Sequence, residues 1–591
     1  MSTAKEFYKQ QSEIYKANRK RIRKQLLGIS LARLLAFILI VTSVFYFLDH
    51  PLYILLTGVP LLVVFLWLLG WYGKKKAAER YALQRIKINE LELKALEGDY
   101  SAFATGEKHR DALHAYSEDI DLFGVRSFFQ FLNRTQTQEG EAYLAKLLKA
   151  NNTDEVVAKQ EVVKELAEKS EWRQNFMTTA SLIDSEVTVA ALISWFANYE
   201  KFTKSYFKWL PKLFALVSMV IIVLFAQEIV GVYLFVGWLI FGFVFTTRFQ
   251  KGVGELSDKL SKNHELLAYY AQLLEQIEQA DFTSDILKEK QSILQQDKNV
   301  TASKEIAILA RRLQNLEHGS NLIVKVFGNG WFLYDLWMSY PVEQWINQNA
   351  SRVEAWLEVT DYFEAQNSLS NFAYNHPEYT YPKIADKEIT FKAKSLCHPL
   401  LLQKEAVPSD VEIGNAEFLI ITGANMAGKS TFLRSVSLAI LMANIGLPIR
   451  ADEVMYQPIP LLTSMRTTDS LEEETSYFFA ELKRLRFIVD NLENRKCFVI
   501  LDEILKGTNS TDKANGSIRF IKKLVAMHAT GMVATHDLSL CAIADEMPQV
   551  KNYFFDTQIK DDELYFDYRL KPGICSDRNA TFLLEKMKIV D

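Results

Sequence analysis

The chain has few cysteines and almost no excess of charge of either sign. Only four cysteines occur in 591 residues, and because their spacing matches no metal-binding pattern, reduced thiols are the expected state. The 68 basic and 72 acidic residues give a formal net charge of −4, which is no global signal for DNA binding. Internal repeats and low-complexity linkers are also absent. A chain of this length is expected to form several domains. The cysteines are Cys397, Cys497, Cys541 and Cys575.

Two long apolar runs stand near the N-terminus. Residues 29–48 are apolar except for Arg33, and residues 52–72 contain no charged side chain. Each run is close to the roughly 20 residues that cross the hydrocarbon core of a bilayer. The sequence Asp49-His50-Pro51 separates them as a tight turn, so the pattern predicts a transmembrane helical hairpin. A pair of buried helices in a soluble core is the alternative.

A second apolar region covers residues 213–247 and contains one charged side chain, Glu228. Division at that residue gives runs of 213–227 and 229–247, the first of which is short for a membrane span. We expect a second transmembrane hairpin here. For residues 213–227 alone, a buried helix of a soluble core remains an open alternative.

Basic residues set the orientation of these hairpins. They lie before and after each apolar pair and are absent from both short turns, which places the flanking ends in the cytoplasm. Both termini and all large domains are therefore expected to be cytoplasmic, in an integral protein of the plasma or inner membrane. The first run is not expected to be a cleaved signal, because it starts late and a second run follows at once. The basic residues are Lys16, Arg19, Lys20, Arg21, Arg23, Lys24, Lys74, Lys75, Lys76, Lys201, Lys204, Lys208, Arg248 and Lys251.

The most informative motif lies at residues 423–430, which read Gly-Ala-Asn-Met-Ala-Gly-Lys-Ser. A β-branched apolar strand (418–422) precedes it, and apolar residues at helical spacing begin at Phe432. In a loop of this type the backbone N–H groups surround phosphates, and the helix N-terminus adds a half-positive end. The motif predicts ATP with Mg²⁺ as cofactor: Lys429 reaches the β- and γ-phosphates, and Ser430 ligates the metal. The predicted ATP-binding residues are Gly423, Asn425, Met426, Ala427, Gly428, Lys429, Ser430 and Thr431.

Two further strand ends extend this prediction. The apolar run 497–501 leads into Asp502 and Glu503. Asp502 is expected to hold Mg²⁺ through its water shell, and Glu503 to orient or deprotonate the attacking water. The strand 531–535 ends at His536, which can sense the γ-phosphate. A chance glycine turn and a structural histidine are the alternatives, but each must also explain the order of the three motifs.

These motifs resemble those of the MutS family of mismatch-repair ATPases, within the wider ABC-type ATPases. Residues 422–431 look like the family's Walker A segment, and residues 502–512 look like its Walker B segment and following loop. Ala534-Thr535-His536 is similar to its histidine switch. The resemblance implies a Mg²⁺-dependent ATPase with Glu503 and His536 as the catalytic residues.

A neighbouring segment, residues 469–481, resembles the part of the family's sequence that contacts ATP on the opposite subunit. The resemblance implies a homodimer in which Ser476 contacts the nucleotide in trans. The match is imperfect, because Glu474 and Thr475 stand where the family usually has Gly-Arg.

Residues 132–176 and 353–373 resemble the MutS core domain, far upstream of the ATPase motifs. The expected fold is multidomain: transmembrane α-helical hairpins, an α-helical MutS-like core and a C-terminal α/β P-loop ATPase of ABC type. The expected boundaries are 1–110 for a basic N-terminal helix, the first hairpin and a cytosolic helix; 111–206 for the first part of the core; 207–251 for the second hairpin; 252–385 for the second part of the core; and 386–591 for the ATPase domain.

One part of the family pattern is missing. Its mismatch-recognition domain inserts a Phe-x-Glu wedge into DNA, and the Phe-x-Glu of this chain, residues 479–481, lies inside the ATPase region. No mismatch or connector domain is expected before residue 112.

Three functions therefore remain open. The first is ATP binding and hydrolysis coupled to DNA, formally mismatched DNA, in mismatch-repair-type metabolism. The second is a membrane ATPase whose nucleotide cycle drives conformational change without DNA, and the third is a scaffold that binds ATP but hardly turns it over. Glu503 argues against the third, and the missing wedge argues against mismatch specificity. The lipid bilayer, a second copy of the chain and DNA are the partners considered.

Overall fold

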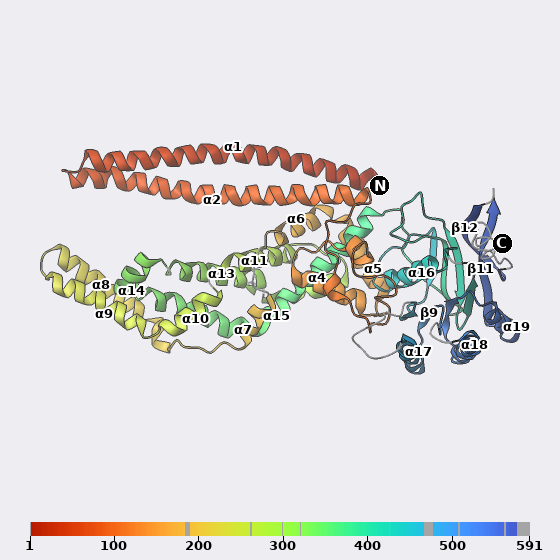
Figure 1. The fold of residues 1–591 in the computed structure, drawn as a ribbon. Helices are drawn as coiled ribbons and strands as arrows, with labels where there is room; N and C mark the ends of the chain where they lie inside the picture. Colours follow the sequence, from red (N-terminus) through yellow and green to blue (C-terminus); the bar gives the residue numbers. More distant parts are fainter. Residues whose placement is uncertain are drawn as a thin grey trace.

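The computed structural model describes residues 2–183, 189–260, 263–297, 300–319, 321–424, 426–465, 477–505, 509–560 and 563–575. Three parts follow one another in the molecule (Figure 1): a long helical hairpin, a helical core drawn out into an arm, and a C-terminal α/β domain. The hairpin and the arm project in the same direction, away from the α/β domain.

The N-terminal hairpin consists of α1 (Ser2–Tyr46) and α2 (Pro51–Leu96). The turn between them is closed by a hydrogen bond from the His50 backbone N–H to the Phe47 carbonyl, 2.8 Å. Each predicted span is the distal half of a helix of 45 or 46 residues, about 70 Å long at 1.5 Å per residue. Among the described residues, these two helices are long and apolar enough to cross a membrane, and little of either apolar window is buried by protein.

A buried polar network joins the proximal half of this hairpin to the core. The Arg134 Nε donates to Glu92 Oε1 at 2.5 Å, and both side chains are almost fully buried. Asn371 and Asn375 donate to the two oxygens of the same Glu92 carboxylate at 3.0 and 3.1 Å. Tyr8, near the start of α1, donates to Asn375 Oδ1 at 2.8 Å. The hairpin is therefore attached to the core through satisfied buried hydrogen bonds.

The core is helical, and its longest element is α15 (Tyr334–Asn375), a 42-residue helix that runs from the arm to the α/β domain. Ser127 and Thr137 cap the first two core helices, since each side chain accepts a backbone N–H three residues on. The remaining core helices pack along α15 or, in the case of α12, against α5. They are α3 (Phe128–Leu132), α4 (Gln138–Lys149), α5 (Val156–Glu168), α6 (Ser170–Ala180), α7 (Val189–Ala197), α10 (Gln250–Leu260), α11 (His264–Glu278), α12 (Asp285–Ser292) and α13 (Ala302–His318), with a small strand pair β1 (Gln295–Asp297) and β2 (Val300–Thr301).

The end of the arm contains a second, shorter helical hairpin, α8 (Leu210–Ala226) and α9 (Val232–Thr247), where the sequence places the second apolar pair. These helices have 17 and 16 residues, and α9 meets the following helix at a bend of 67°. The first is at the lower limit of the range of about 17–25 residues for a membrane span, and the second lies just below it. A π-helical turn, η4 (Val324–Gly328), and α14 (Asn329–Phe332) lie beside this hairpin.

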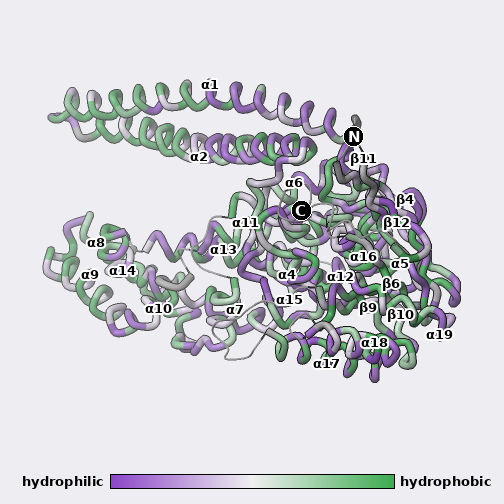
Figure 2. The backbone as a smooth tube through the Cα atoms, turned by 45° about the vertical axis from the view of Figure 1, so that its right-hand side comes forward, coloured by the Kyte–Doolittle hydropathy of each residue, from purple (hydrophilic) through white to green (hydrophobic). Residues whose placement is uncertain are grey.

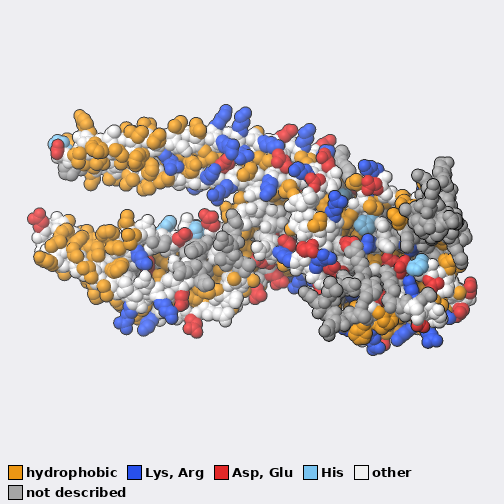
Figure 3. Space-filling model, viewed as in Figure 1, with side chains coloured by type: hydrophobic (Ala, Val, Ile, Leu, Met, Phe, Trp, Pro, Cys, Tyr) orange, Lys and Arg blue, Asp and Glu red, His pale blue; other side chains and the backbone are white. Residues whose placement is uncertain are grey.

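Hydropathy changes along both projections in the same way. Figure 2 shows the distal parts of α1–α2 and of α8–α9 as hydrophobic, whereas the proximal part of α1–α2 is largely hydrophilic. In Figure 3, apolar side chains cover both distal ends, and a group of basic side chains borders the apolar zone of α1–α2. The two apolar ends lie at the same end of the molecule, opposite the α/β domain.

The α/β domain is built on a sheet with the strand order β12-β11-β6-β10-β9-β8 in the described part of the chain. Its strands from β8 to β11 run parallel, and β12 pairs antiparallel at the edge. Alternate strand residues face opposite sides, and both sides are covered by helices: α16 on one, and α17, α18 and α19 on the other. The bounds are β6 (Phe418–Thr422), β8 (Leu461–Ser464), β9 (Phe498–Asp502), β10 (Thr530–Ala534), β11 (Val550–Lys560), β12 (Glu563–Pro572), α16 (Lys429–Asn444), α17 (Tyr477–Asn494), α18 (Ser510–Ala526) and α19 (Ile543–Glu546).

A second sheet, of order β3-β7-β4-β5, packs beside the first and carries the loop that borders the site described next. Its strands are β3 (Lys383–Ile384), β4 (Ile389–Leu396), β5 (Ser409–Gly414) and β7 (Glu453–Tyr456). Residues just after the expected boundary at 111 also pack into this domain: Tyr116 and Leu122 are fully buried in the hydrophobic cluster that contains α16. The start of the predicted core region is thus physically part of the α/β domain.

Candidate nucleotide-binding site

The glycine loop connects β6 to α16, as the sequence predicts. Gly423 has φ +148° and Gly428 has φ +103°, values that favour glycine over residues with a side chain. A Cβ on Gly423 would also come within 2.9 Å of the Phe555 carbonyl oxygen. The helix begins at Lys429, so its N-terminal N–H groups face the loop. Asn425 lies outside the described residues, and its predicted contact stays a prediction.

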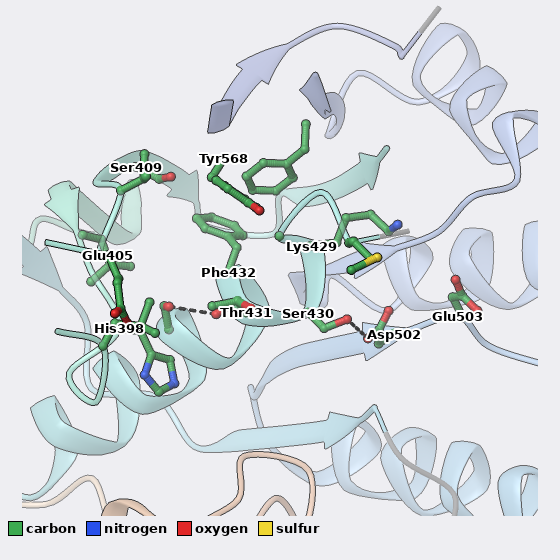
Figure 4. Close-up of a pocket in the computed structure, with 17 residues that line it drawn as sticks. His398, Glu405, Ser409, Lys429, Ser430, Thr431, Phe432, Asp502, Glu503 and Tyr568 are labelled. Atoms are coloured by element: carbon green, nitrogen blue, oxygen red, sulfur yellow. Dashed lines mark hydrogen bonds between the residues drawn. The ribbon is translucent and has the colours of Figure 1, made fainter. Parts of the chain in front are cut away.

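Lys429 and Ser430, the first two residues of α16, point their polar atoms to the site (Figure 4). The Lys429 amine is buried and donates to the carbonyl oxygens of Gly423 and Ala424 at 2.8 and 3.0 Å, and burial lowers its pKa. The Ser430 hydroxyl donates to Asp502 Oδ2 at 2.7 Å. The two residues that the sequence predicts as Mg²⁺ ligands are therefore in direct contact, although 72 residues separate them.

The predicted catalytic pair also meets. Glu503 follows β9 and His536 follows the neighbouring strand β10, and His536 Nδ1 lies 2.9 Å from Glu503 Oε1. The Glu503 backbone is in the left-handed region at φ +51°, and its N–H donates to the Ala534 carbonyl at 2.9 Å. Parallel pairing of β9 with β10 brings these two strand ends to one edge of the sheet.

A cavity of about 640 Å³ opens over the loop and has two different ends. Its polar end is lined by Lys429, Ser430, Asp502 and Glu503, together with Met426 and Thr431. Its other end is mostly apolar and is closed by residues from four segments, namely Leu401, Val407, Phe432, Phe555 and Tyr568. The cavity can thus hold a ligand with a phosphate-like end and a flat apolar end.

Sequence reasoning missed this apolar end, because Leu401 and Val407 lie in the loop between β4 and β5 whereas Phe555 and Tyr568 lie on β11 and β12. His398 borders the same cavity, and burial, followed by the charges of Arg434 and Arg450, lowers its pKa to about 4. It is therefore a neutral imidazole at neutral pH.

Glu481 on α17 holds the loop that follows the acid pair. Its buried carboxylate accepts a hydrogen bond of 2.5 Å from the backbone N–H of Leu505, two residues beyond Glu503. On the same helix, Arg484 donates to the Ala115 carbonyl at 2.6 Å. The segment just before α17, with Ser476 and the unusual Glu474 and Thr475, lies outside the described residues. The contact that the sequence predicts in trans therefore remains a prediction.

These features define an α/β domain in which a strand, a glycine loop and a helix meet an acidic strand end across a parallel sheet. Residues 419–585 match the family model described as MutS domain V. This C-terminal part of the chain is therefore of the MutS domain V type.

Relatives that match include mismatch-repair proteins and their homologues. "MutS protein homolog 4" of Homo sapiens is 29% identical over 238 residues, 38% of this chain and 25% of that protein. "DNA mismatch repair protein MSH4" of Arabidopsis thaliana is 32% identical over 180 residues, 30% of this chain and 23% of that protein. "DNA mismatch repair protein MutS" of Thermotoga maritima is 29% identical over 230 residues, 38% of this chain and 29% of that protein. The chain thus spans about a quarter of the length of these relatives.

Proposed function

We propose that this protein is a membrane-anchored, Mg²⁺-dependent ATPase of the MutS family whose nucleotide cycle changes the arrangement of its two projections. The observation that carries the proposal is the hydrogen bond of 2.7 Å between Ser430 and Asp502, next to the buried Lys429. Beside it, Glu503 contacts His536, which follows the neighbouring strand. Two chain segments distant in sequence, the start of α16 and the end of β9, supply a lysine, a hydroxyl and two carboxylates to one cavity.

The residues present fit Mg·ATP. A hydroxyl and a carboxylate are the hard oxygen ligands that Mg²⁺ prefers, so Ser430 and Asp502 would hold the ion, which would neutralise phosphate charge. Lys429 would leave its present carbonyl partners and bind phosphate oxygens. Glu503 would accept a proton from water, and His536, bonded to that carboxylate, would orient it.

The apolar end of the cavity suits a nucleotide base. Phe432, Phe555 and Tyr568 offer ring faces and edges, and the neutral His398 offers a hydrogen-bonding nitrogen near them. A site closed in trans by Ser476 of a second copy, as the family resemblance implies, would require a homodimer.

Membrane anchoring is supported by exposure. In the distal half of α2, large apolar side chains such as Val63 and Trp67 are about 60% exposed over a stretch without charge. Soluble proteins rarely leave an apolar surface of this extent in water. The hairpin α1–α2 would insert into a bilayer up to its basic border, which leaves the nucleotide site in the cytoplasm.

Coupling between site and membrane is supported by connectivity. The helix α15 begins in the arm beside α8–α9 and ends at the polar network that holds α1–α2, next to the α/β domain. Any movement of the α/β domain that shifts α15 would therefore change the relation of the two apolar ends.

DNA binding in mismatch-repair-type metabolism is the second candidate, favoured by the names of the matched relatives. The ends of the projections are apolar rather than basic, which suits lipid better than phosphate.

One experiment separates the two candidates. The purified full chain would be reconstituted in nanodiscs, and its ATP hydrolysis measured with and without paired and mismatched duplex DNA. Mg²⁺-dependent hydrolysis that depends on Glu503 and ignores DNA is the expected result. Absence of hydrolysis in the folded, reconstituted protein would contradict the proposal, and stimulation by mismatched over paired duplex would favour the second candidate.

A further inference from the structure

The arm turns back at residues 319–334. This segment is apolar, although the helices on both sides of it belong to the core. It contains one charged residue, Lys325, and joins α13 to α15. Both of these helices return to the core, so the two flanks of the segment lie on the same side of any membrane that α8–α9 enters. Sixteen residues are also fewer than the roughly 20 needed for one helical crossing.

The inner face of this turn is held against the apolar hairpin by backbone contact. A Cβ on Gly242 of α9 would come within 2.4 Å of the Gly330 carbonyl oxygen, and a Cβ on Gly330 would meet Leu239 at 2.7 Å. The Trp331 ring lies 4.5 Å from the Phe235 ring. Small residues that let two backbones touch are typical of helix packing in membranes, and this contact fixes the depth of the turn along α9.

A reciprocal pair of hydrogen bonds braces the same turn. The Asn329 amide donates to Asp335 Oδ2 at 2.8 Å, and the Asp335 backbone N–H donates to Asn329 Oδ1 at 2.9 Å. Asn329 is buried, so this pair lies on the inner side of the turn.

The outer face is apolar and open. Leu322 is 75% exposed, Ile323 69% and Phe327 54%, and they lie in or next to η4, which packs against α9 of the apolar hairpin. Between them stands Lys325, whose long side chain can bring its amine to a phosphate head group while its methylenes stay among apolar neighbours.

We propose that residues 321–332 form a re-entrant element that enters the cytoplasmic leaflet beside α8–α9 and leaves on the same side. Leu322, Ile323 and Phe327 contact acyl chains near the interface, and Lys325 contacts lipid phosphate. This inference rests on the proposed membrane anchoring and adds a third lipid-contacting element, in a region that the sequence assigns to the soluble core.

The test uses the full chain in vesicles of phosphatidylcholine and phosphatidylglycerol, with single added cysteines that carry an environment-sensitive fluorophore. Phe327→Cys is the test position, Leu55→Cys in the apolar half of α2 is the lipid control, and Gln314→Cys on α13 is the water control. The parent chain gives the background from its native cysteines. Quenching by shallow and deep spin-labelled lipids is compared with quenching by iodide in water.

We expect Phe327→Cys to be quenched several-fold more strongly by the shallow lipid label than by the deep one, and weakly by iodide. Gln314→Cys should respond to iodide alone. Strong iodide quenching at Phe327→Cys, with lipid quenching intact at Leu55→Cys, would overturn the re-entrant element while leaving the membrane anchor standing. Absence of lipid quenching at both positions would overturn the anchor as well.

Two other outcomes also contradict the inference. Quenching at Phe327→Cys by neither reagent would mean that protein, such as a second copy of the chain, covers the patch. Deep quenching equal to that at Leu55→Cys would mean full insertion. A Gly330→Leu variant adds a readout of packing: it should displace the turn from α9 and lower the lipid quenching at position 327.

Discussion

The α/β domain and the two projections use the same apolar residue types but bury them in opposite ways. All five residues of β6 are buried between helices on the two faces of the sheet. In the distal half of α2, Leu62 and Val63 are 47% and 60% exposed. In the α/β domain, protein alone buries the apolar side chains. In the projections, an apolar phase outside the protein would be needed to remove them from water.

The contrast separates what each region needs in order to work. The nucleotide site requires exact placement of a few polar groups, which a rigid, protein-packed sheet supplies. Under the proposed function, the projections require only a surface that lipid accepts and an attachment that transmits movement. For the α1–α2 hairpin, the buried hydrogen-bond network around Glu92 is that attachment, because its hydrogen bonds are directional.

The largest effect is expected at the nucleotide site. Lys429→Ala should abolish nucleotide binding or nearly so, because the amine contacts phosphate charge, whereas Glu503→Gln should keep binding and trap ATP, because that carboxylate acts on water. Titration of a fluorescent ATP analogue against each variant in detergent measures both. Equal loss of affinity in the two variants would mean that the roles are wrongly assigned.

The attachment should be next. Glu92→Ala leaves Arg134 buried without its carboxylate, which costs about 3–5 kcal/mol when one partner of a buried ion pair is removed. Limited proteolysis and thermal unfolding of the full chain in detergent should show a released hairpin. Glu90→Ala is the matched control, since its salt bridge to Lys16 is exposed and should contribute little. Identical melting of the two variants would argue against a structural role of the network.

The lipid-facing half of α2 should reject charge where its proximal half accepts it. Val63→Arg places a charge in the predicted span and should cost about 2.5–3.5 kcal/mol of membrane insertion. Leu83→Arg changes an exposed leucine of the same helix outside the span and should be nearly neutral. The fraction of each variant recovered in membranes after carbonate extraction measures the difference. Equal recovery would contradict a bilayer around residue 63.

A smaller effect is expected in the core, where burial and then the nearby Glu364 raise the pKa of Asp361 to about 8. Its ordinary value is about 4, so between pH 4 and 8 the folded state binds a proton that the unfolded state has lost, and stability falls as pH rises through that window. Asp361→Asn should remove this loss and raise the melting temperature relative to the parent more at pH 8 than at pH 5. Glu354→Gln, an exposed change on the same helix, is the control, and a pH-independent difference would count against the raised pKa.

The strand, glycine loop and helix around the candidate site were predictable because the local sequence pattern decides their positions. The predicted strand 418–422 is β6 with the same bounds, because a buried parallel strand before a glycine loop leaves little choice of register. The helix begins at Lys429, three residues before the first apolar residue that indicated it, because its first turn lines the cavity with polar side chains.

Helix lengths and long-range contacts were predictable only in part. The predicted first span begins at residue 29, but the helix α1 begins at Ser2. A change from apolar to charged residues changes the surroundings that suit a helix, but it does not end the helix. The Glu92 network was out of reach, since its partners Arg134 and Asn371 lie 42 and 279 residues away along the chain. The apolar end of the nucleotide cavity escaped prediction for the same reason.

The central claim is that nucleotide binding changes the arrangement of the two apolar ends, and a distance measurement tests it directly. Spin labels at Asp49→Cys and Glu228→Cys, the turns of the two hairpins, report that arrangement in nanodiscs. In a Glu503→Gln background, Mg·ATP should shift the distribution of distances between the labels, and Lys429→Ala should prevent the shift. An unchanged distribution at saturating, demonstrably bound Mg·ATP would contradict the account.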